Sequence, residues 1–343
     1  MNSITFKPKQ VVKRLLSALP PRAKDVIIGR YGLGDDAHKM TLESIGKTYK
    51  ITRERVRQIE GYAINVIRKS EFYKKEQSIF DELEQYLKKM GGVVPEVDLL
   101  TSLAKDKSTQ NFIHFLLVIG ESFKKDKEDD EFQHRWHVDE KLSINVHEAL
   151  KKLYKGLKDD EILPESEMIS AFLEHIKEVN EEYKKEEILK RWLSMSKLID
   201  KNPLGEWGRA ESTSIRAKGI RDYAYLVIRK HGSPIHFREV AKAITRVFGK
   251  KAHIATTHNE LIKDSRFVLV GRGLYALSEW GYLTGIVRDV IKGILEKHGP
   301  LSKKEIIDKV LKERYVKENT ILVNLQNTKH FKKDKEGNYA ITK

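Results

Sequence analysis

The stretch TRERVRQIEGYAINVIRKS, residues 52–70, predicts a helix whose two ends differ in character. Its apolar residues recur at intervals of three and four, the spacing that places side chains on one face of a helix. This predicted buried stripe consists of Val56, Ile59, Ala63, Val66 and Ile67. The polar residues of the first two turns fall on the other side, and they include Arg53, Glu54, Arg57 and Gln58. Thr52 suits the N-cap position, because its hydroxyl oxygen can accept from a free backbone N–H of the first turn.

Further helices are predicted before this one. They span residues 8–19, 22–32 and 41–50. Pro20 and Pro21 separate the first two helices, and Gly32 ends the second. Thr41 is suited to cap the third. An order of helix, helix, short turn and helix is typical of a helix-turn-helix unit, in which the start of the last helix contacts base edges. The polar start of the helix after residue 52 is therefore a candidate DNA-reading surface.

Positive charge is concentrated near the start of the chain. The 343 residues carry a formal net charge of +15, and residues 1–75 hold 17 Lys and Arg against 7 Asp and Glu. Such a region favours a polyanionic partner, because it raises the local affinity for phosphate. The absence of cysteine excludes disulfides and thiolate zinc sites. We find no signal segment and no run near the ~20 apolar residues of a membrane span, so we expect a cytoplasmic, nucleoid-associated protein that binds no membrane.

Beyond residue 75 the chain repeats one plan of three predicted helices and a short alternating stretch with a polar tip, the order of a winged helix. The predicted winged-helix segments are 76–141, 142–210, 219–283 and 284–343, after a helix-turn-helix domain over 1–75. IRKHGSPIHFREV and LEKHGPLSKKEI align between the last two segments, which favours duplication. Residues 203–219, rich in Gly, Ser and Thr, are the predicted linker. The predicted fold class is mainly α, with a helix-turn-helix domain followed by several winged-helix units.

Two regions carry family resemblances. Residues 8–75 resemble region 4 of the sigma-70 family, the promoter-recognition subunits of bacterial RNA polymerase. The residues responsible are LPPRAKDVIIGRYGL and then TLESIGKTYKITRERVRQIEGYAINVIRKS, in which RYGL, TLESIG and TRERVRQIE are family signatures. Residues 219–283 resemble a HARE-HTH domain, a winged helix also found in the delta subunit of RNA polymerase, through GSPIHFREVAKAI and GRGLYALSEW.

The sigma-70 resemblance implies a role for each polar residue at the start of the 52–70 helix. The implied readers of bases in a −35-like promoter element of double-stranded DNA are Arg53, Glu54 and Gln58. The implied contacts to the DNA backbone are Thr52, Arg55 and Arg57. The chemistry agrees, since Arg and Gln make paired hydrogen bonds to guanine and adenine edges and a carboxylate accepts from cytosine. The helices at 8–19 and 22–32 match the part that docks on the flap of the RNA polymerase core. No segment matches region 2, which captures flipped bases of the −10 element, so we expect that the chain is not a complete sigma factor.

Other patterns have simpler structural interpretations. The histidines of HRWH and HIATTH have no carboxylate at matching spacing, so we expect no metal site. GRGLY follows a strand-like run but opens no helix, which favours a hairpin turn over a phosphate loop. The acidic run at 126–131 is expected at a hairpin tip that stays out of a DNA groove. The tryptophans expected to fill cores are Trp136, Trp192, Trp207 and Trp280. We find no nucleophile–base pair or catalytic carboxylate set, so we expect neither an enzyme nor a cofactor.

Three functions remain open from the sequence. The leading one is a sequence-specific DNA-binding transcription regulator that acts at promoters with bacterial RNA polymerase. The second is a delta-like interaction subunit of the polymerase with little DNA readout. The polar residues after Thr52 favour the first, because docking on the flap alone would not need them. The third is a DNA-binding accessory protein of a restriction and modification system. It rests on the HARE-HTH resemblance alone, and no nuclease motif accompanies it.

Overall fold

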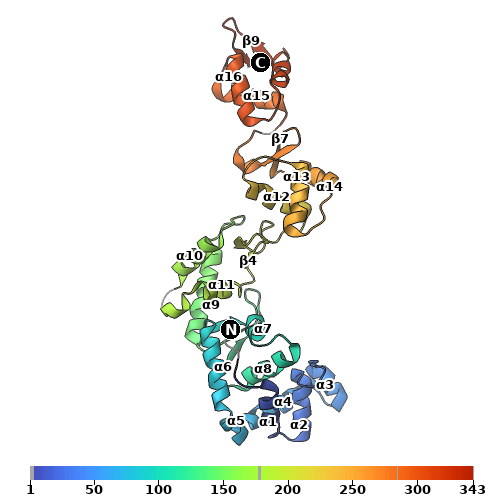
Figure 1. The fold of residues 1–343 in the computed structure, drawn as a ribbon, viewed down its shortest axis with the longest axis vertical. Helices are drawn as coiled ribbons and strands as arrows, with labels where there is room; N and C mark the ends of the chain where they lie inside the picture. Colours follow the sequence, from blue (N-terminus) through green and yellow to red (C-terminus); the bar gives the residue numbers. More distant parts are fainter. Residues whose placement is uncertain (1–3, 177–178, 284, 343) are drawn as a thin grey trace. The chain divides into compact units, whose positions relative to one another are not determined.

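The computed structural model describes residues 4–176, 179–283 and 285–342. The chain forms two compact units, residues 1–211 and 212–343. Each unit consists mainly of α-helices with small antiparallel sheets (Figure 1), so the predicted fold class is confirmed. None of the helices in these described ranges has the length and apolar character that crossing a bilayer requires.

The first unit begins with the predicted helix-turn-helix. Its helices are α1 (Pro8–Leu16), α2 (Pro21–Tyr31), α3 (Leu42–Tyr49) and α4 (Arg53–Lys69). Thr41 and Thr52 are N-caps as expected, because each hydroxyl oxygen accepts a 3.1 Å hydrogen bond from a backbone N–H of the following turn. The turn between α3 and α4 is tight at Gly46, where a Cβ atom would lie 2.7 Å from the carbonyl oxygen of Ile51. Glycine therefore allows the close approach that this turn needs.

The predicted apolar stripe of α4 faces the inside of the unit. Its fully buried members are Val56, Ala63 and Ile67, and its partly buried members are Ile59 and Val66. Val56 packs with Val26 of α2 and Ile45 of α3 in a small core of their own. This small core holds the start of α4 against the two preceding helices, with its polar side turned outward.

A short helix, α5 (Glu71–Lys75), leads into the first winged-helix segment. Its elements are α6 (Gln77–Lys89), β1 (Val93–Pro95), α7 (Glu96–Leu103), α8 (Lys107–Ile119), β2 (Lys124–Asp126) and β3 (Arg135–His137), with strand order β1-β3-β2. Helix α8 packs against α1, α2 and α4. One hydrophobic core joins Leu15, Ile27 and Ile67 to Phe112 and Phe115 of α8. The domain boundary expected between residues 75 and 76 stays a prediction. The hydrophobic core includes residues on both sides of this position.

The next segment repeats the plan. It comprises α9 (Glu140–Gly156), α10 (Glu165–His175), the 3₁₀ turn η1 (Glu181–Tyr183), α11 (Glu186–Leu193), β4 (Ile199–Lys201) and β5 (Trp207–Arg209). Val93 and Phe132 of the preceding segment lie in its core. The Trp192 indole also donates a 3.0 Å hydrogen bond to the Val93 carbonyl. The two winged-helix segments of the first unit therefore share buried residues.

The second unit contains two further segments of the same kind. The first is α12 (Ile220–His231), β6 (Ile235–His236), α13 (Phe237–Phe248), α14 (Ile254–Lys263), β7 (Phe267–Gly271), β8 (Leu274–Leu277) and the 3₁₀ turn η2 (Ser278–Trp280). The second is α15 (Val287–His298), α16 (Lys303–Glu313), α17 (Glu318–Leu325), β9 (Phe331–Lys333) and β10 (Tyr339–Ile341). The buried Arg314 guanidinium joins them, since it donates to the carbonyl oxygens of Leu269 at 2.7 Å and Gly285 at 3.0 Å.

Several local predictions can be compared with these elements. The linker predicted at 203–219 contains the division between the two units but is wrong for Trp207–Arg209, which is strand β5 paired with β4. Glycines at 205 and 208 gave this stretch the composition of a linker, although it is also the polar-tipped alternating stretch expected at the end of the segment 142–210. GRGLY forms the predicted hairpin turn between β7 and β8. Trp136, Trp192 and Trp207 fill cores as expected, while Trp280 is only partly buried.

Candidate nucleic-acid interface

The start of α4 exposes a dense set of polar side chains. Its exposed residues are Thr52, Arg53, Glu54, Arg55, Arg57 and Gln58. They extend over the first two turns of a helix whose buried side is fixed by the core around Val56. The backbone that carries them is therefore held in place, while the side chains remain accessible to a partner.

Two pairs form among these exposed side chains. Glu54 accepts from the Arg57 guanidinium through both carboxylate oxygens, at 2.6 and 2.9 Å. This hydrogen bonding lowers the pKa of Glu54 and raises the pKa of Arg57 from their ordinary values. Arg55 donates a 3.0 Å hydrogen bond to the side-chain oxygen of Gln58. Within the described residues, Arg53 makes no hydrogen bond or ion pair, so its guanidinium is the group most ready for a ligand.

Thr52 has a structural role that the sequence predicted. Its hydroxyl oxygen accepts from the backbone N–H of Arg55 and so caps α4. The hydroxyl hydrogen stays available as a donor, because a hydroxyl group both accepts and donates. The cap also leaves Thr52 at the positive end of the helix dipole, which favours a nearby anion.

A groove beside α4 adds residues that sequence analysis missed. Its lining residues are Pro20, Arg22, Ala23, Arg55, Gln58, Ile59 and Tyr62. Arg22 lies over the ring of Tyr49 at 5.7 Å, and Tyr62 is 56% exposed. Tyr62 follows Gln58 by four residues and Arg55 by seven, the spacing of one helix face. That spacing could have identified Tyr62, whereas Arg22 becomes a neighbour only when α2 packs on α4.

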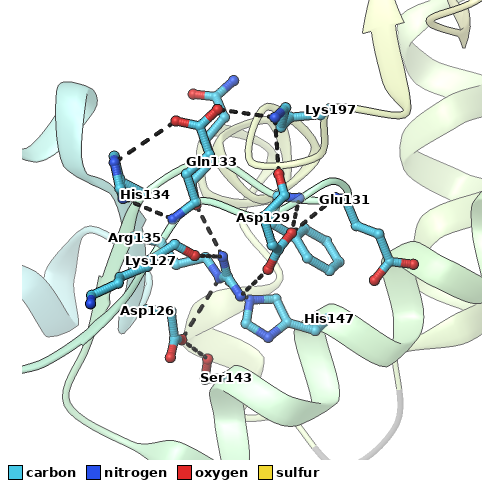
Figure 2. Close-up of polar contacts among 12 residues, drawn as sticks. Asp126, Lys127, Asp129, Glu131, Gln133, His134, Arg135, Ser143, His147 and Lys197 are labelled. Atoms are coloured by element: carbon cyan, nitrogen blue, oxygen red, sulfur yellow. Dashed lines mark hydrogen bonds and ion pairs between the residues drawn. The ribbon is translucent and has the colours of Figure 1, made fainter.

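The acidic run at 126–131 lies in and before the β2–β3 loop, as expected, but it is not a free tip. Asp129 accepts from Arg135, Glu128 pairs with Lys197 at 3.0 Å, and Glu131 pairs with Lys151. Figure 2 shows this loop folded onto neighbouring side chains around the buried Arg135. The loop is therefore attached to the second winged-helix segment. Its negative charges are matched by basic side chains of this chain.

The histidines of HRWH also lie in this region. His134 accepts from the backbone N–H of Glu128 at 2.8 Å, and His137 is buried in β3, 3.4 Å from Asp126. His258 stacks on the Phe237 ring at 4.2 Å, and His253 precedes α14. Within the described ranges, no group of three or more His, Asp or Glu side chains has the arrangement of a metal site.

A capped helix-turn-helix with a basic, exposed final helix defines a DNA-binding module, and comparisons with known proteins place it in a family. Residues 15–69 match the family model described as Sigma-70, region 4. The RNA polymerase sigma factor SigA1 of Synechococcus elongatus is 47% identical over 60 residues, which is 18% of this chain and 15% of the relative. The sigma factor SigA of Clostridium acetobutylicum is 40% identical over 73 residues, 21% and 19% of the two chains. The sigma factor RpoD of Helicobacter pylori is 47% identical over 64 residues, 19% and 10%.

These matches cover less than a fifth of each of the three relatives. The family model covers residues 15–69 and leaves the winged-helix segments without an assignment. Residues 15–69 are therefore a sigma-70 region 4 domain, a DNA-binding helix-turn-helix.

Proposed function

We propose that the chain is a sequence-specific transcription regulator that acts at promoters with bacterial RNA polymerase. The observation that carries this proposal is the exposed polar start of α4, held on a region 4 domain by a Thr52 cap and a small apolar core. The start of α4 enters the major groove of a −35-like element. The winged-helix segments add contacts to DNA or to the polymerase, and the one at 219–283 serves as a HARE-HTH-like unit.

Three side chains read bases in this proposal. Arg53 makes no hydrogen bond or ion pair within the described residues and can make paired hydrogen bonds to a guanine edge. Gln58 has its oxygen engaged by Arg55 but keeps its amide hydrogens for an adenine edge. Glu54 accepts from a cytosine amine once its ion pair with Arg57 opens. That opening is easy because both partners are exposed to water.

The backbone contacts follow from the same geometry. Arg55 and Arg57 each have five donors, so a guanidinium can keep one protein partner while it donates to a phosphate. Thr52 donates its hydroxyl hydrogen to a phosphate at the start of the helix. Because phosphates are the same at every base pair, these residues strengthen binding without selecting a sequence.

Contact with RNA polymerase would involve the outer surfaces of α1 and α2. The apolar residues of α1, among them Val11, Val12, Leu15 and Leu16, are already buried within this chain. A contact to the polymerase flap through α1 and α2 would therefore use the polar outer sides of these helices. Retention of core polymerase on the immobilised full chain tests this association separately from DNA binding.

Selection of binding sites from random duplex DNA tests base readout. The full chain should select one motif, and Arg53→Ala or Gln58→Ala should weaken binding to that motif by about 1–3 kcal/mol and relax the choice of base at one position. Arg55→Ala is the matched control on the same helix. It should weaken all sequences about equally and leave the selected motif unchanged.

The opposite result has a clear meaning. If all three substitutions weaken binding uniformly and the motif persists, α4 does not read bases. A chain that then still retained core polymerase would instead fit the delta-like role, in which protein contacts dominate and DNA readout is minor.

A further inference from the structure

The loop between α2 and α3, residues 32–41, is held against α8. Asn111 of α8 donates from its side-chain amide to the carbonyl oxygens of Gly32 at 3.0 Å and Ala37 at 2.9 Å. Asn111 is 1% exposed, so these hydrogen bonds are protected from water. The winged-helix segment therefore positions the loop that leads directly into the Thr41 cap of α3.

Basic side chains from both elements meet at this contact. Lys39 of the loop and Lys107, the first residue of α8, are exposed, and Lys125 of β2 lies half-buried behind them. Asn111 lies one turn after Lys107 and bonds to Ala37, two residues before Lys39, so its hydrogen bond brings the loop lysine to the start of α8. The charges of the lysines also act on His114, two turns into α8. Within the described residues, Lys39 and Lys107 make no hydrogen bond or ion pair. We call Lys39, Lys107 and Lys125 the α8 lysine cluster.

The carboxylates near the cluster are already engaged: Asp106, next to Lys107, caps α8 by accepting from the backbone N–H of Thr109, and Glu96 pairs with Lys125. Glu96 pairs with Lys125, accepts a 2.8 Å hydrogen bond from the Trp136 indole, and lies 3.6 Å from His114 Nε2. The loop's own carboxylates also have partners, since Asp35 lies 3.5 Å from Lys9 and Asp36 accepts from a backbone N–H. Within the described residues, Lys39 and Lys107 therefore form no ion pair, and the charge that favours Lys39 comes from Glu96, which Lys125 already engages.

Loss of hydration and neighbouring cations both disfavour the charged form of Lys39. Although the Lys39 side chain is exposed, it loses part of its hydration to neighbouring protein atoms, and this desolvation, with the charge of Lys107 next in importance, lowers the pKa of Lys39 from its ordinary value. A lysine crowded by other cations gains most from an anion placed between them, because the anion is attracted by every charge of the cluster at once.

We propose that the α8 lysine cluster binds the phosphate backbone of the same DNA duplex that α4 reads. This inference rests on the proposed function. Lys39 is four residues before Glu43, and four residues of chain span at most about 14 Å. Glu43 is close enough to Arg53, at the start of α4, for their charges to interact. The cluster therefore borders the helix-turn-helix at α3, and in such domains the helix before the recognition helix crosses the DNA backbone.

Lysine suits this role better than base reading. An ammonium group acts as a point charge toward phosphate and specifies little. A duplex carries one negative charge per ~1.7 Å of its axis, so a strand that passes α3 offers several phosphates to the cluster. The first winged-helix segment would then extend the DNA contact of α4 through α8 and its preceding turn, while its β2–β3 loop stays attached to the second segment.

The test replaces Lys39 and Lys107 by glutamine in the full chain. Binding to the selected duplex is titrated at several salt concentrations, and the motif is selected again from random DNA. Each phosphate contact contributes about −0.9 to the slope of log K against log salt. The double variant Lys39→Gln/Lys107→Gln should therefore have a slope shallower by about 1.8 with an unchanged motif. Hydroxyl-radical footprinting should lose protection on one flank of the site only.

A matched control is the double variant Lys75→Gln/Lys89→Gln. It removes the same charge from exposed positions at the ends of α5 and α6, which carry no member of the cluster. This control should keep the slope and the footprint of the wild-type chain. Thermal unfolding of both variants should match the wild type, because all four side chains are exposed.

The outcomes separate the two proposals. An unchanged slope and footprint in Lys39→Gln/Lys107→Gln, with a selected motif in the wild type, overturns the cluster and leaves the proposed function standing. Loss of core-polymerase retention with an unchanged DNA slope assigns the cluster to a protein partner and also overturns the inference. A wild-type chain that selects no motif and binds no duplex overturns the proposed function itself.

Discussion

Helices α4 and α8 occupy the same place in two related motifs, and the protein uses them in opposite ways. Helix α4 is the last helix of the helix-turn-helix, and α8 is the last helix of the first winged-helix segment, directly before strands β2 and β3. Of the 17 residues of α4, three are fully buried, and its first two turns expose the polar set after Thr52. Of the 13 residues of α8, seven are fully buried, and they pack against α1, α2 and α4.

This difference shows that the last helix of a winged-helix segment can be buried against a neighbouring helix-turn-helix and stabilise it. The string NFIHFLLVI in α8 supplies apolar side chains on nearly every face, which is typical of a helix buried inside a protein. A helix covered in this way cannot enter a major groove. Only its first turn, at Lys107, reaches the surface next to the helix-turn-helix.

The largest expected effect is the loss of this support. Phe115 of α8 is 0% exposed and lies 4.9 Å from the Tyr31 ring. Phe115→Ala should lower the free energy of unfolding of the first unit by about 3–5 kcal/mol, because a large cavity forms between the two motifs. Val97→Ala on the neighbouring α7, where Val97 is 65% exposed, should change it by less than about 0.5 kcal/mol. Equal effects in denaturant titrations would mean that α8 does not support the helix-turn-helix.

Acid sensitivity is a second consequence of burying α8. Burial, with nearby cations, lowers the pKa of His114 to about 3, whereas an unfolded histidine titrates near ~6.5. Between these values the unfolded chain binds a proton that the folded chain does not. The free energy of unfolding should therefore fall as the pH drops through this window, by at most about 1.4 kcal/mol per pH unit.

Urea titrations between pH 7 and pH 4 measure this slope. His114→Gln should make the slope shallower, because the titrating group is removed. His38→Gln, at an exposed histidine in the adjacent loop, should keep the wild-type slope. The same slope in wild type and His114→Gln would show that another group is responsible.

For α4, the N-cap should contribute both to stability and to DNA binding. Thr52→Ala removes the acceptor for the backbone N–H of Arg55 and should cost about 1 kcal/mol of stability. DNA affinity should fall with it, since the polar set is carried by the turn that frays. Thr48→Ala on the exposed side of α3 is the control and should change neither quantity. Calorimetry and DNA titration together check the result, and unchanged stability in Thr52→Ala would contradict the capping role.

The smallest expected effect comes from the exposed ion pair. Glu54→Gln releases Arg57 and removes a negative charge from the start of α4. It should tighten binding to random duplex by a few-fold and blur the selected motif at one position. Glu71→Gln breaks a pair of the same i, i+3 geometry with Lys74 on α5 and should leave both measurements unchanged. Weaker binding to random duplex in Glu54→Gln would argue that the ion pair orders Arg57 for phosphate.

The sequence by itself determined the helix-turn-helix and much of its candidate site. The apolar residues from Val56 to Ile67 recur at intervals of three and four, and this spacing predicts which face of α4 is buried. The residues on the opposite face are then the exposed ones. Thr41 and Thr52 marked the helix starts, because a capping hydrogen bond needs only residues three positions apart. These features are local, so the order of residue types is enough to predict them.

Only the tertiary structure decided how the two motifs combine. The burial of α1 by α8, the hydrogen bonds of Asn111 to the 32–41 loop, and the meeting of Lys39 with Lys107 join residues about 70 or more positions apart. The acidic loop also depends on packing between segments, because its charges pair with Lys151 and Lys197 on the following segment. Such contacts depend on which faces pack together in space, and a one-dimensional pattern of charge and hydropathy does not specify that choice.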